Sequence, residues 1–165
     1  MKNVQFGCGG NPIPGWENYD SDVDITKPLP FESNSCDLVF AEHLLEHIPT
    51  NKGYLFLEEC VRILVPGGQL GIIVPDPTKL EGNITPKYVQ FFVNMGMKPN
   101  PVRCCMTEFG HQAAWTKPLL ETVFRSLGLS ITTDEGRFKG CSGHAKFIGE
   151  EFNAIDSVTV IGEKS

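Results

Sequence analysis

The feature that most constrains the fold is an apolar run, rich in β-branched residues, at positions 69–74 of this 165-residue chain. Pro66-Gly67-Gly68 precedes the run, and Pro75-Asp76-Pro77 follows it. A short run of this composition between two turn signals predicts a β-strand. Because its apolar side chains would lie on both faces, we expect this strand in the interior of a parallel sheet.

Strand and helix signals alternate along the rest of the chain. Further short strands are predicted at 4–6, 17–19, 37–40, 129–133 and 157–162. A helix is predicted at 54–64, where apolar residues recur at helical spacing and form one face: Tyr54, Leu57, Val61 and Leu64. Such alternation predicts one α/β domain over residues 1–165, with helices on the faces of a mostly parallel sheet. Ligands then bind at the carboxyl ends of the strands.

Two further helices are predicted from their start signals. Thr85 followed by Pro86 resembles an N-cap with proline at the first helical position, for a helix to about Asn94. Thr116 can cap a second helix that ends at Gly128 and carries a broad apolar stripe: Leu119, Leu120, Val123, Phe124 and Leu127. The stretch 85–115 lies between the strand predicted at 69–74 and the helix that Thr116 caps. It is far longer than an ordinary connector of about 4 to 6 residues. We therefore expect it to form an insert or lid over a binding site. The alternative is a helix that only covers the sheet, which Phe91, Phe92 and Val93 would satisfy equally well.

Charge and composition exclude several classes of protein. The formal net charge of -6 disfavours general nucleic-acid binding, which requires many Lys and Arg side chains to neutralise phosphates. The apolar runs are far shorter than the roughly 20 residues that cross a bilayer. No signal-like apolar stretch follows Met1. We expect a cytoplasmic protein with no membrane association, of open oligomeric state.

The six cysteines are expected to be reduced thiols. Their spacing is irregular and no export signal accompanies them. A zinc set of Cys105, His111, Cys141 and His144 is disfavoured because the chain has no CxxC pair. The sequence therefore predicts no metal ligands.

The chain from residue 4 to residue 76 resembles class I S-adenosylmethionine-dependent methyltransferases, in particular a compact group of them. The motifs that carry the resemblance follow one another in the same order, beginning with Gly7-Cys8-Gly9, Pro14-Gly15-Trp16, Asn18-Tyr19-Asp20 and Asp24-Ile25-Thr26-Lys27-Pro28-Leu29-Pro30-Phe31. Later motifs are Cys36-Asp37-Leu38-Val39-Phe40, His43-Leu44-Leu45-Glu46-His47-Ile48 and Arg62-Ile63-Leu64-Val65-Pro66-Gly67-Gly68. The resemblance implies a Rossmann-like three-layer sandwich and S-adenosylmethionine as the cofactor.

The resemblance also implies which residues hold that cofactor. Gly7 and Gly9 would let the main chain approach the methionyl group, since glycine permits positive φ and leaves room for a ligand. Asp20 would accept hydrogen bonds from the ribose hydroxyls, and Asp24 with the backbone at Leu29 would contact the adenine. Each aspartate has an alternative role in a turn. The full predicted cofactor set is Phe6, Gly7, Cys8, Gly9, Asp20, Asp24, Ile25, Leu29, Glu42 and His43.

Two departures from the family pattern are visible. Residues 11–15 contain two prolines and leave no room for the helix that usually follows the glycine loop. Only three residues separate Asp20 from Asp24, too few for a crossover between parallel strands. We therefore expect a sheet that is shortened near the first helix, with a missing or vestigial edge strand.

The acceptor of the methyl group is not indicated by the sequence, and a small molecule is one class of candidate. His43 and His111 are candidate general bases because imidazole titrates near neutral pH. Glu42 and Asp76 lie near predicted strand ends and could line the acceptor pocket. Two other functions stay open. One is a non-catalytic S-adenosylmethionine-binding module; the other, disfavoured, is a zinc hydrolase that uses His43-Leu44-Leu45-Glu46-His47.

Overall fold

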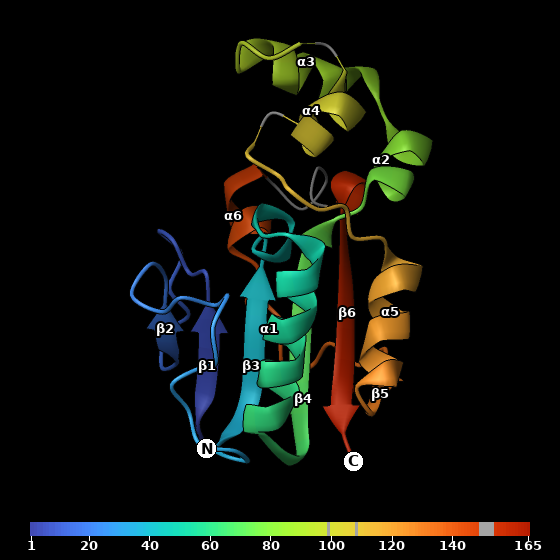
Figure 1. Cartoon of the computed structure of the whole chain (residues 1–165). Helices are drawn as coiled ribbons and strands as arrows, with labels where there is room; N and C mark the ends of the chain where they lie inside the picture. Colours follow the sequence, from blue (N-terminus) through green and yellow to red (C-terminus); the bar gives the residue numbers. More distant parts are fainter. Residues whose placement is uncertain (99, 108, 149–153) are drawn as a thin grey trace.

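The computed structural model describes residues 1–98, 100–107, 109–148 and 154–165, and it forms a six-stranded sheet with helices beside and above it (Figure 1). The strands are β1 (Asn3–Phe6), β2 (Glu17–Tyr19), β3 (Cys36–Glu42), β4 (Leu64–Pro75), β5 (Leu129–Thr132) and β6 (Ser157–Lys164). The helices are the 3-10 turn η1 (Leu45–His47), α1 (Thr50–Ile63), α2 (Pro77–Asn83), α3 (Pro86–Asn94), α4 (Pro101–Thr107), α5 (Lys117–Ser126) and α6 (Gly143–Ile148).

The sheet has the strand order β2-β1-β3-β4-β6-β5. β1 pairs in parallel with β2 and β3, and β3 pairs in parallel with β4. β6 runs antiparallel to both of its neighbours, β4 and β5. The mostly parallel α/β fold is therefore confirmed. The strand predicted at 69–74 is interior, as expected, but only its β3 side is parallel.

One face of the sheet packs against α1 and α5. The large core on this side includes Phe6 from β1, Phe56 from α1 and Phe124 from α5, all essentially inaccessible to solvent. The face predicted for α1 is rotated from the observed one: Tyr54 is 37% exposed, whereas the buried positions are Gly53, Phe56, Leu57, Cys60 and Ile63. On α5, Leu119 is likewise exposed. Periodicity found both helices but assigned some residues to the wrong face.

The opposite face is covered mainly by irregular chain. Ile13 and Phe138 lie on this side in a smaller core with Leu38, Phe40, Ile73, Cys141 and Ile161. The side chain of Gln5, buried in this face, accepts a hydrogen bond from the backbone N–H of Ile13 at 3.0 Å and so holds the loop after β1 in place. The third layer of the expected sandwich is thus built mostly from loops, because residues 7–16 contain no helix.

The sheet is shortened at the edge where the sequence predicted it. The edge strand β2 has three residues, and residues 20–35 form turns and bends with no strand beyond it. The two predicted helix caps are also confirmed. The side chain of Thr85 accepts from the N–H of Tyr88 at the start of α3, and that of Thr116 accepts from the N–H of Leu119 at the start of α5.

Helices α2, α3 and α4 lie beyond the carboxyl ends of the parallel strands (Figure 1). A separate small core holds this group together: Leu80, Tyr88, Phe92, Cys104 and Ile155. We call residues 77–116 the cap. No helix in the described ranges combines the length and the apolar character needed to span a membrane.

Candidate functional site

The glycine loop leaves the carboxyl end of β1 in an unusual backbone conformation. Gly7 and Gly9 have φ of 68° and 48°, values that side-chain-bearing residues rarely adopt. The loop is tied to β2, because the N–H of Cys8 donates to the carbonyl of Tyr19 at 3.1 Å and that of Gly9 donates to the Asp20 carboxylate at 3.3 Å. Asp20 is therefore next to the loop, as the sequence predicted, and is exposed to solvent.

A cavity of about 210 Å³ adjoins this loop. Five predicted cofactor residues line it, and three further residues complete it: Gln5, Asn11 and His144 join Gly7, Cys8, Gly9, Glu42 and His43. No heavy atom lies within 4 Å of the place where a Cβ on Gly9 would lie, so the backbone there is open to a ligand.

The other five predicted cofactor residues do not line this cavity, although one of them, Asp20, contacts the glycine loop. Asp24 is engaged in a turn: its carboxylate accepts from the N–H and hydroxyl of Thr26 and pairs with Lys27 at 3.0 Å. These hydrogen bonds, chiefly that from the Thr26 hydroxyl, lower the pKa of Asp24 to about 2. The backbone N–H of Leu29 donates to Glu59 at 2.7 Å, and its carbonyl accepts from Arg62. The side chains of Phe6 and Ile25 belong to the large core.

Glu42 is held by the chain that precedes and begins α6. Its carboxylate accepts from the Ser142 hydroxyl and from the N–H groups of Gly143 at 2.7 Å and His144 at 3.1 Å. These bonds bring α6 against the glycine loop, where a Cβ on Gly143 would lie 2.6 Å from Cβ of Asn11. Glu42 thus lines the cavity and also anchors a segment about a hundred residues away in sequence.

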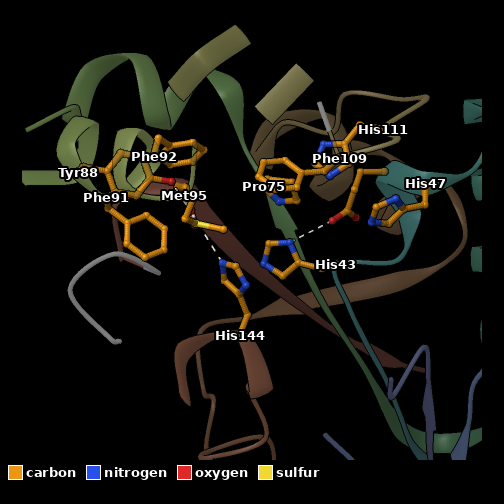
Figure 2. Close-up of a pocket in the computed structure, with 12 residues that line it drawn as sticks. His43, His47, Pro75, Tyr88, Phe91, Phe92, Met95, Phe109, His111 and His144 are labelled. Carbon is orange, nitrogen blue, oxygen red and sulfur yellow. Dashed lines mark hydrogen bonds and ion pairs between the residues drawn. The ribbon is translucent and has the colours of Figure 1, made fainter. Parts of the chain in front are cut away.

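A second, larger cavity of about 340 Å³ lies under the cap and contains most of the aromatic side chains near the site (Figure 2). Its walls come from η1 and the chain just before it, the end of β4, α3, the chain after α4, α6 and the chain just before β6. The residues that line it are His43, Glu46, His47, Pro75, Tyr88, Phe91, Phe92, Met95, Phe109, His111, His144 and Asp156. His43 and His144 line both cavities, and their ring centroids are 3.9 Å apart. The predicted insert therefore contributes walls to a cavity that shares two wall residues with the cavity at the glycine loop.

His43 is fixed at both ring nitrogens and has a positive φ of 49°. Nδ1 lies 3.0 Å from Glu46 Oε1, and Nε2 lies 3.2 Å from the Ser157 hydroxyl. Burial lowers the pKa of His43, but the hydrogen bond to Glu46 and the charges of Glu46, Glu42 and Asp156 outweigh it, so the pKa is raised. Since the Ser157 hydroxyl donates to Asp156, it accepts from His43. This arrangement favours an imidazolium ion, which suits a positioning residue better than a general base.

Asp156 links the cap to the start of β6. It is buried and accepts hydrogen bonds of 2.5 Å from the Tyr88 hydroxyl and from Ser157, while His144 Nε2 lies 3.8 Å away. Burial raises the pKa of Asp156, but the interactions with His144, Ser157 and Tyr88 outweigh this effect, and the pKa is lowered. The aspartate is therefore ionised at neutral pH.

His43 and His47 do not share a helix face, which removes the geometry required for the zinc-hydrolase hypothesis. The helical turn η1 covers only Leu45–His47, and His43 precedes it. The His43 ring lies against that of His144 at an interplanar angle of 40°, whereas the His47 ring meets that of His111 at a centroid distance of 4.8 Å. Asp76 is also not a cavity residue: it caps α2 by accepting from the N–H groups of Thr78 and Lys79.

Three of the site residues were not anticipated as such by the sequence. Tyr88 was assigned only to a helix, and His144 only to a disfavoured zinc set. Asp156 was not singled out at all. These residues come together through α3, α6 and β6, and no short motif marks their pairing.

Comparisons with known proteins agree with the sheet topology. Residues 17–72 match a family model described as a methyltransferase domain. An S-adenosylmethionine-dependent methyltransferase from Archaeoglobus fulgidus superposes with a TM-score of 0.58 at 15% identity, covering 99% of this chain and 86% of its own. A second S-adenosylmethionine-dependent methyltransferase, from Mesorhizobium loti, superposes with a TM-score of 0.57 at 15% identity, covering 99% of this chain and 90% of its own. A third, from Thermotoga maritima, superposes with a TM-score of 0.59 at 16% identity, covering 99% of this chain and 82% of its own. No curated protein matches the sequence.

These findings confirm the fold that the resemblance implied. The chain has the Rossmann-like fold of class I methyltransferases, and its first half contains a segment that matches the methyltransferase-domain family.

Proposed function

We propose that this chain binds S-adenosylmethionine at the glycine loop and transfers its methyl group to an acceptor held in the aromatic cavity. The observation that carries the proposal is the shared wall between the two cavities, formed by His43 and His144. A methyl donor beside the loop and an acceptor under the cap would meet at this wall. The methyltransferase-domain match and the fold support the choice of cofactor.

The residues at the glycine loop fit the methionyl and ribose parts of this cofactor. Gly7 and Gly9 have positive φ, and the backbone at Gly9 is open, whereas a Cβ on Gly7 would lie 3.0 Å from the Leu44 side chain. The Asp20 carboxylate lies within hydrogen-bond distance of Gly9 at the carboxyl end of β2. A carboxylate with two acceptor oxygens suits a ribose with two adjacent hydroxyls. The adenine assignments fit less well, because Asp24 and the backbone of Leu29 already form internal hydrogen bonds. We therefore assign Gly7, Gly9 and Asp20 to the cofactor first.

The bound cofactor would supply an activated methyl group on a sulfonium sulfur. The task left to the protein is to hold donor and acceptor in line and to exclude water. The aromatic side chains of the cap suit an apolar or aromatic acceptor. Hydrogen bonds link Glu46, His43, Ser157 and Asp156 in a network that holds His43 in the shared wall.

His111 is the candidate for direct contact with the acceptor. It lies in the wall of the aromatic cavity beside Phe109, on the chain between α4 and α5. Replacement by alanine should lower turnover and leave cofactor affinity nearly unchanged, because the residue does not line the cavity at the glycine loop. A parallel fall of activity and melting temperature would instead assign His111 a structural role.

Calorimetric titration with S-adenosylmethionine and S-adenosylhomocysteine tests the cofactor assignment. Asp20→Ala should weaken binding by about 1.5 to 3 kcal/mol, the range for hydrogen bonds to a charged group. Asp134→Ala is the matched control, since Asp134 follows β5 at the other edge of the sheet. Its carboxylate accepts a local hydrogen bond from the N–H of Gly136 at 2.9 Å. Failure of the wild type to bind either compound would reject the proposal.

A non-catalytic binding module is the alternative function. The bonds from Ser142, Gly143 and His144 to Glu42 favour it, because they commit a carboxylate at the glycine-loop cavity to an internal role. Cofactor binding without methyl transfer to a broad panel of small aromatic acceptors would support this alternative over catalysis.

A further inference from the structure

The wall of the aromatic cavity contains a group of three side chains of metal-ligating types, and the methyltransferase proposal gives none of them a metal. We propose that Glu46, His47 and His111 bind one divalent transition-metal ion. One ligand atom from each residue lies within 4.8 Å of the others, the only such group of three among the described residues. All three residues line the cavity.

Backbone hydrogen bonds set this juxtaposition. The N–H groups of Gln112 and Ala113 donate to the carbonyl of Glu46 at 2.6 and 3.2 Å. The side-chain amide of Gln112 donates to the carbonyl of His47 at 2.7 Å, and the indole of Trp115 donates to that of Leu45 at 3.2 Å. The chain after α4 is thus fastened to η1, so His111 is held beside His47 by contacts that do not involve either imidazole.

The Glu46 carboxylate gives an independent indication of a cation. Its residue is 1% exposed, Oε1 is paired with His43, and Oε2 is buried with no hydrogen-bond partner. A buried carboxylate oxygen without a partner is costly and calls for an explanation such as an ion. His43 would then act as the outer hydrogen-bond partner that orients a ligating carboxylate.

The ligand types indicate the class of metal. Two imidazoles and one carboxylate are ligands of Zn²⁺ and other first-row transition metals, and three protein ligands leave positions open for water or substrate. Metal–ligand bonds of about 2.0 to 2.2 Å require the three atoms to approach more closely than they do here, through small rotations of the side chains. The open positions would be accessible from the aromatic cavity.

This proposal departs from the sequence-based expectation of no metal ligands. That expectation was based on the pair His43 and His47 and on the cysteines. The fold separates that pair and brings in His111, which is 64 positions after His47. The metal site does not depend on the methyltransferase assignment, since no residue of the glycine loop takes part in it.

Metal titration of the chelator-treated full chain provides the test. Zn²⁺ measured by calorimetry should bind at one ion per chain, and Co²⁺ should give a spectrum of nitrogen and oxygen ligands without thiolate charge transfer. His47→Ala and His111→Ala should each reduce affinity at least about tenfold. His144→Ala is the matched control, because His144 lines the same cavity but lies outside the group of three, and it should bind as the wild type does.

Glu46→Gln keeps the size of the side chain and is a second variant for the metal titration. Its melting temperature, compared with that of the wild type, shows whether the variant is folded. Lost metal affinity in a folded Glu46→Gln protein would support the site. Absence of binding by the wild type, undiminished binding by both histidine variants, or a thiolate spectrum would each overturn it. A parallel cofactor titration of metal-free protein separates failure of this site from failure of the proposed function. If a cationic acceptor is the true partner of Glu46, the metal titration is flat while cofactor binding persists.

Discussion

Two regions of the molecule are stabilised in different ways. One is the sheet with α1 and α5, and the other is the cap over the carboxyl ends of the parallel strands. In the sheet region, side chains from β1, β3, β4, β6, α1 and α5 meet in one large apolar core. In the cap, a core of five buried residues holds three short helices, and polar contacts through Asp76 and Asp156 join them to the sheet. The difference indicates that the sheet region supplies stability, while the cap and its boundary supply the candidate acceptor site.

The largest expected effect is on the free energy of unfolding, when a buried phenylalanine is replaced by alanine in each of the two regions. Phe56→Ala removes a ring that is inaccessible to solvent and packs edge-on against Phe6, and it should lower the free energy of unfolding by about 3 to 5 kcal/mol. Phe92→Ala, in the small cap core, should cost less than half of that. Denaturant unfolding of both variants measures the difference. Equal losses would show that cap and sheet form one core.

Removal of Asp76 should have the next largest effect, because it joins the two regions. Its carboxylate caps α2 and also accepts from the N–H of Lys117 at the start of α5, at 2.8 Å. Asp76→Ala should cost about 2 to 3 kcal/mol, from a lost cap and a lost buried hydrogen bond. A loss of unfolding free energy below about 0.5 kcal/mol would show that the Asp76 contacts between the cap and the sheet region contribute little to stability.

The same carboxylate should make stability depend on pH. Burial raises the pKa of Asp76, but hydrogen bonds from Thr78, Lys117 and Lys79 outweigh it, so the folded-state pKa is lowered. The unfolded chain therefore binds the proton more readily, with a pKa near 3.9. The contribution of Asp76 is present above about pH 4 and is lost as the pH falls through the folded-state value. Asp76→Asn should weaken the fall of the unfolding free energy at acid pH. If the variant loses stability at acid pH as steeply as the wild type, other carboxylates cause the loss.

A smaller effect is expected for Tyr88→Phe, which removes one hydroxyl from the boundary. The lost hydrogen bond is the one that Tyr88 donates to the buried carboxylate of Asp156. The cap should open more easily by about 1.5 kcal/mol, seen as faster hydrogen exchange in α3 with little change in the sheet. Uniform acceleration throughout the chain would contradict independent opening of the cap.

The smallest effect is expected at the surface of α5. Glu121 and Arg125 form an exposed pair with a distance of 3.4 Å, and such pairs contribute little. Glu121→Gln should change the free energy of unfolding by less than about 0.5 kcal/mol. A larger change would show that surface charge on α5 contributes substantially to the stability of the sheet region.

The sheet region could be predicted because its signals are local. Residues 17–19 were predicted with the observed bounds, and the glycine loop was placed correctly at the end of β1. The errors concern which face of a helix is buried. Tyr54 and Leu119 fit the apolar spacing, yet the sheet contacts the neighbouring positions Phe56 and Leu120. Periodicity alone does not determine the orientation of a helix when apolar residues lie on more than one side.

The site beneath the cap could be predicted only in part, because its contacts join distant segments. His43 and His111 were both singled out, but nothing in either motif indicates that His43 lies against His144 or His111 against His47. The role of Asp24 was also undetermined, because an aspartate at a turn and one at a ligand look alike in sequence. Here its neighbours Thr26 and Lys27 satisfy the carboxylate locally.

The most direct test of the central claim is amide NMR of the ¹⁵N-labelled chain titrated with S-adenosylhomocysteine. The proposed cofactor site predicts the largest shift changes at Gly7, Cys8, Gly9 and Asp20, where the loop is tied to β2. It predicts only small changes along β5, at the other edge of the sheet. Saturating ligand that leaves the glycine-loop amides unchanged, or that shifts a different surface, would contradict the proposed binding of S-adenosylmethionine at the glycine loop.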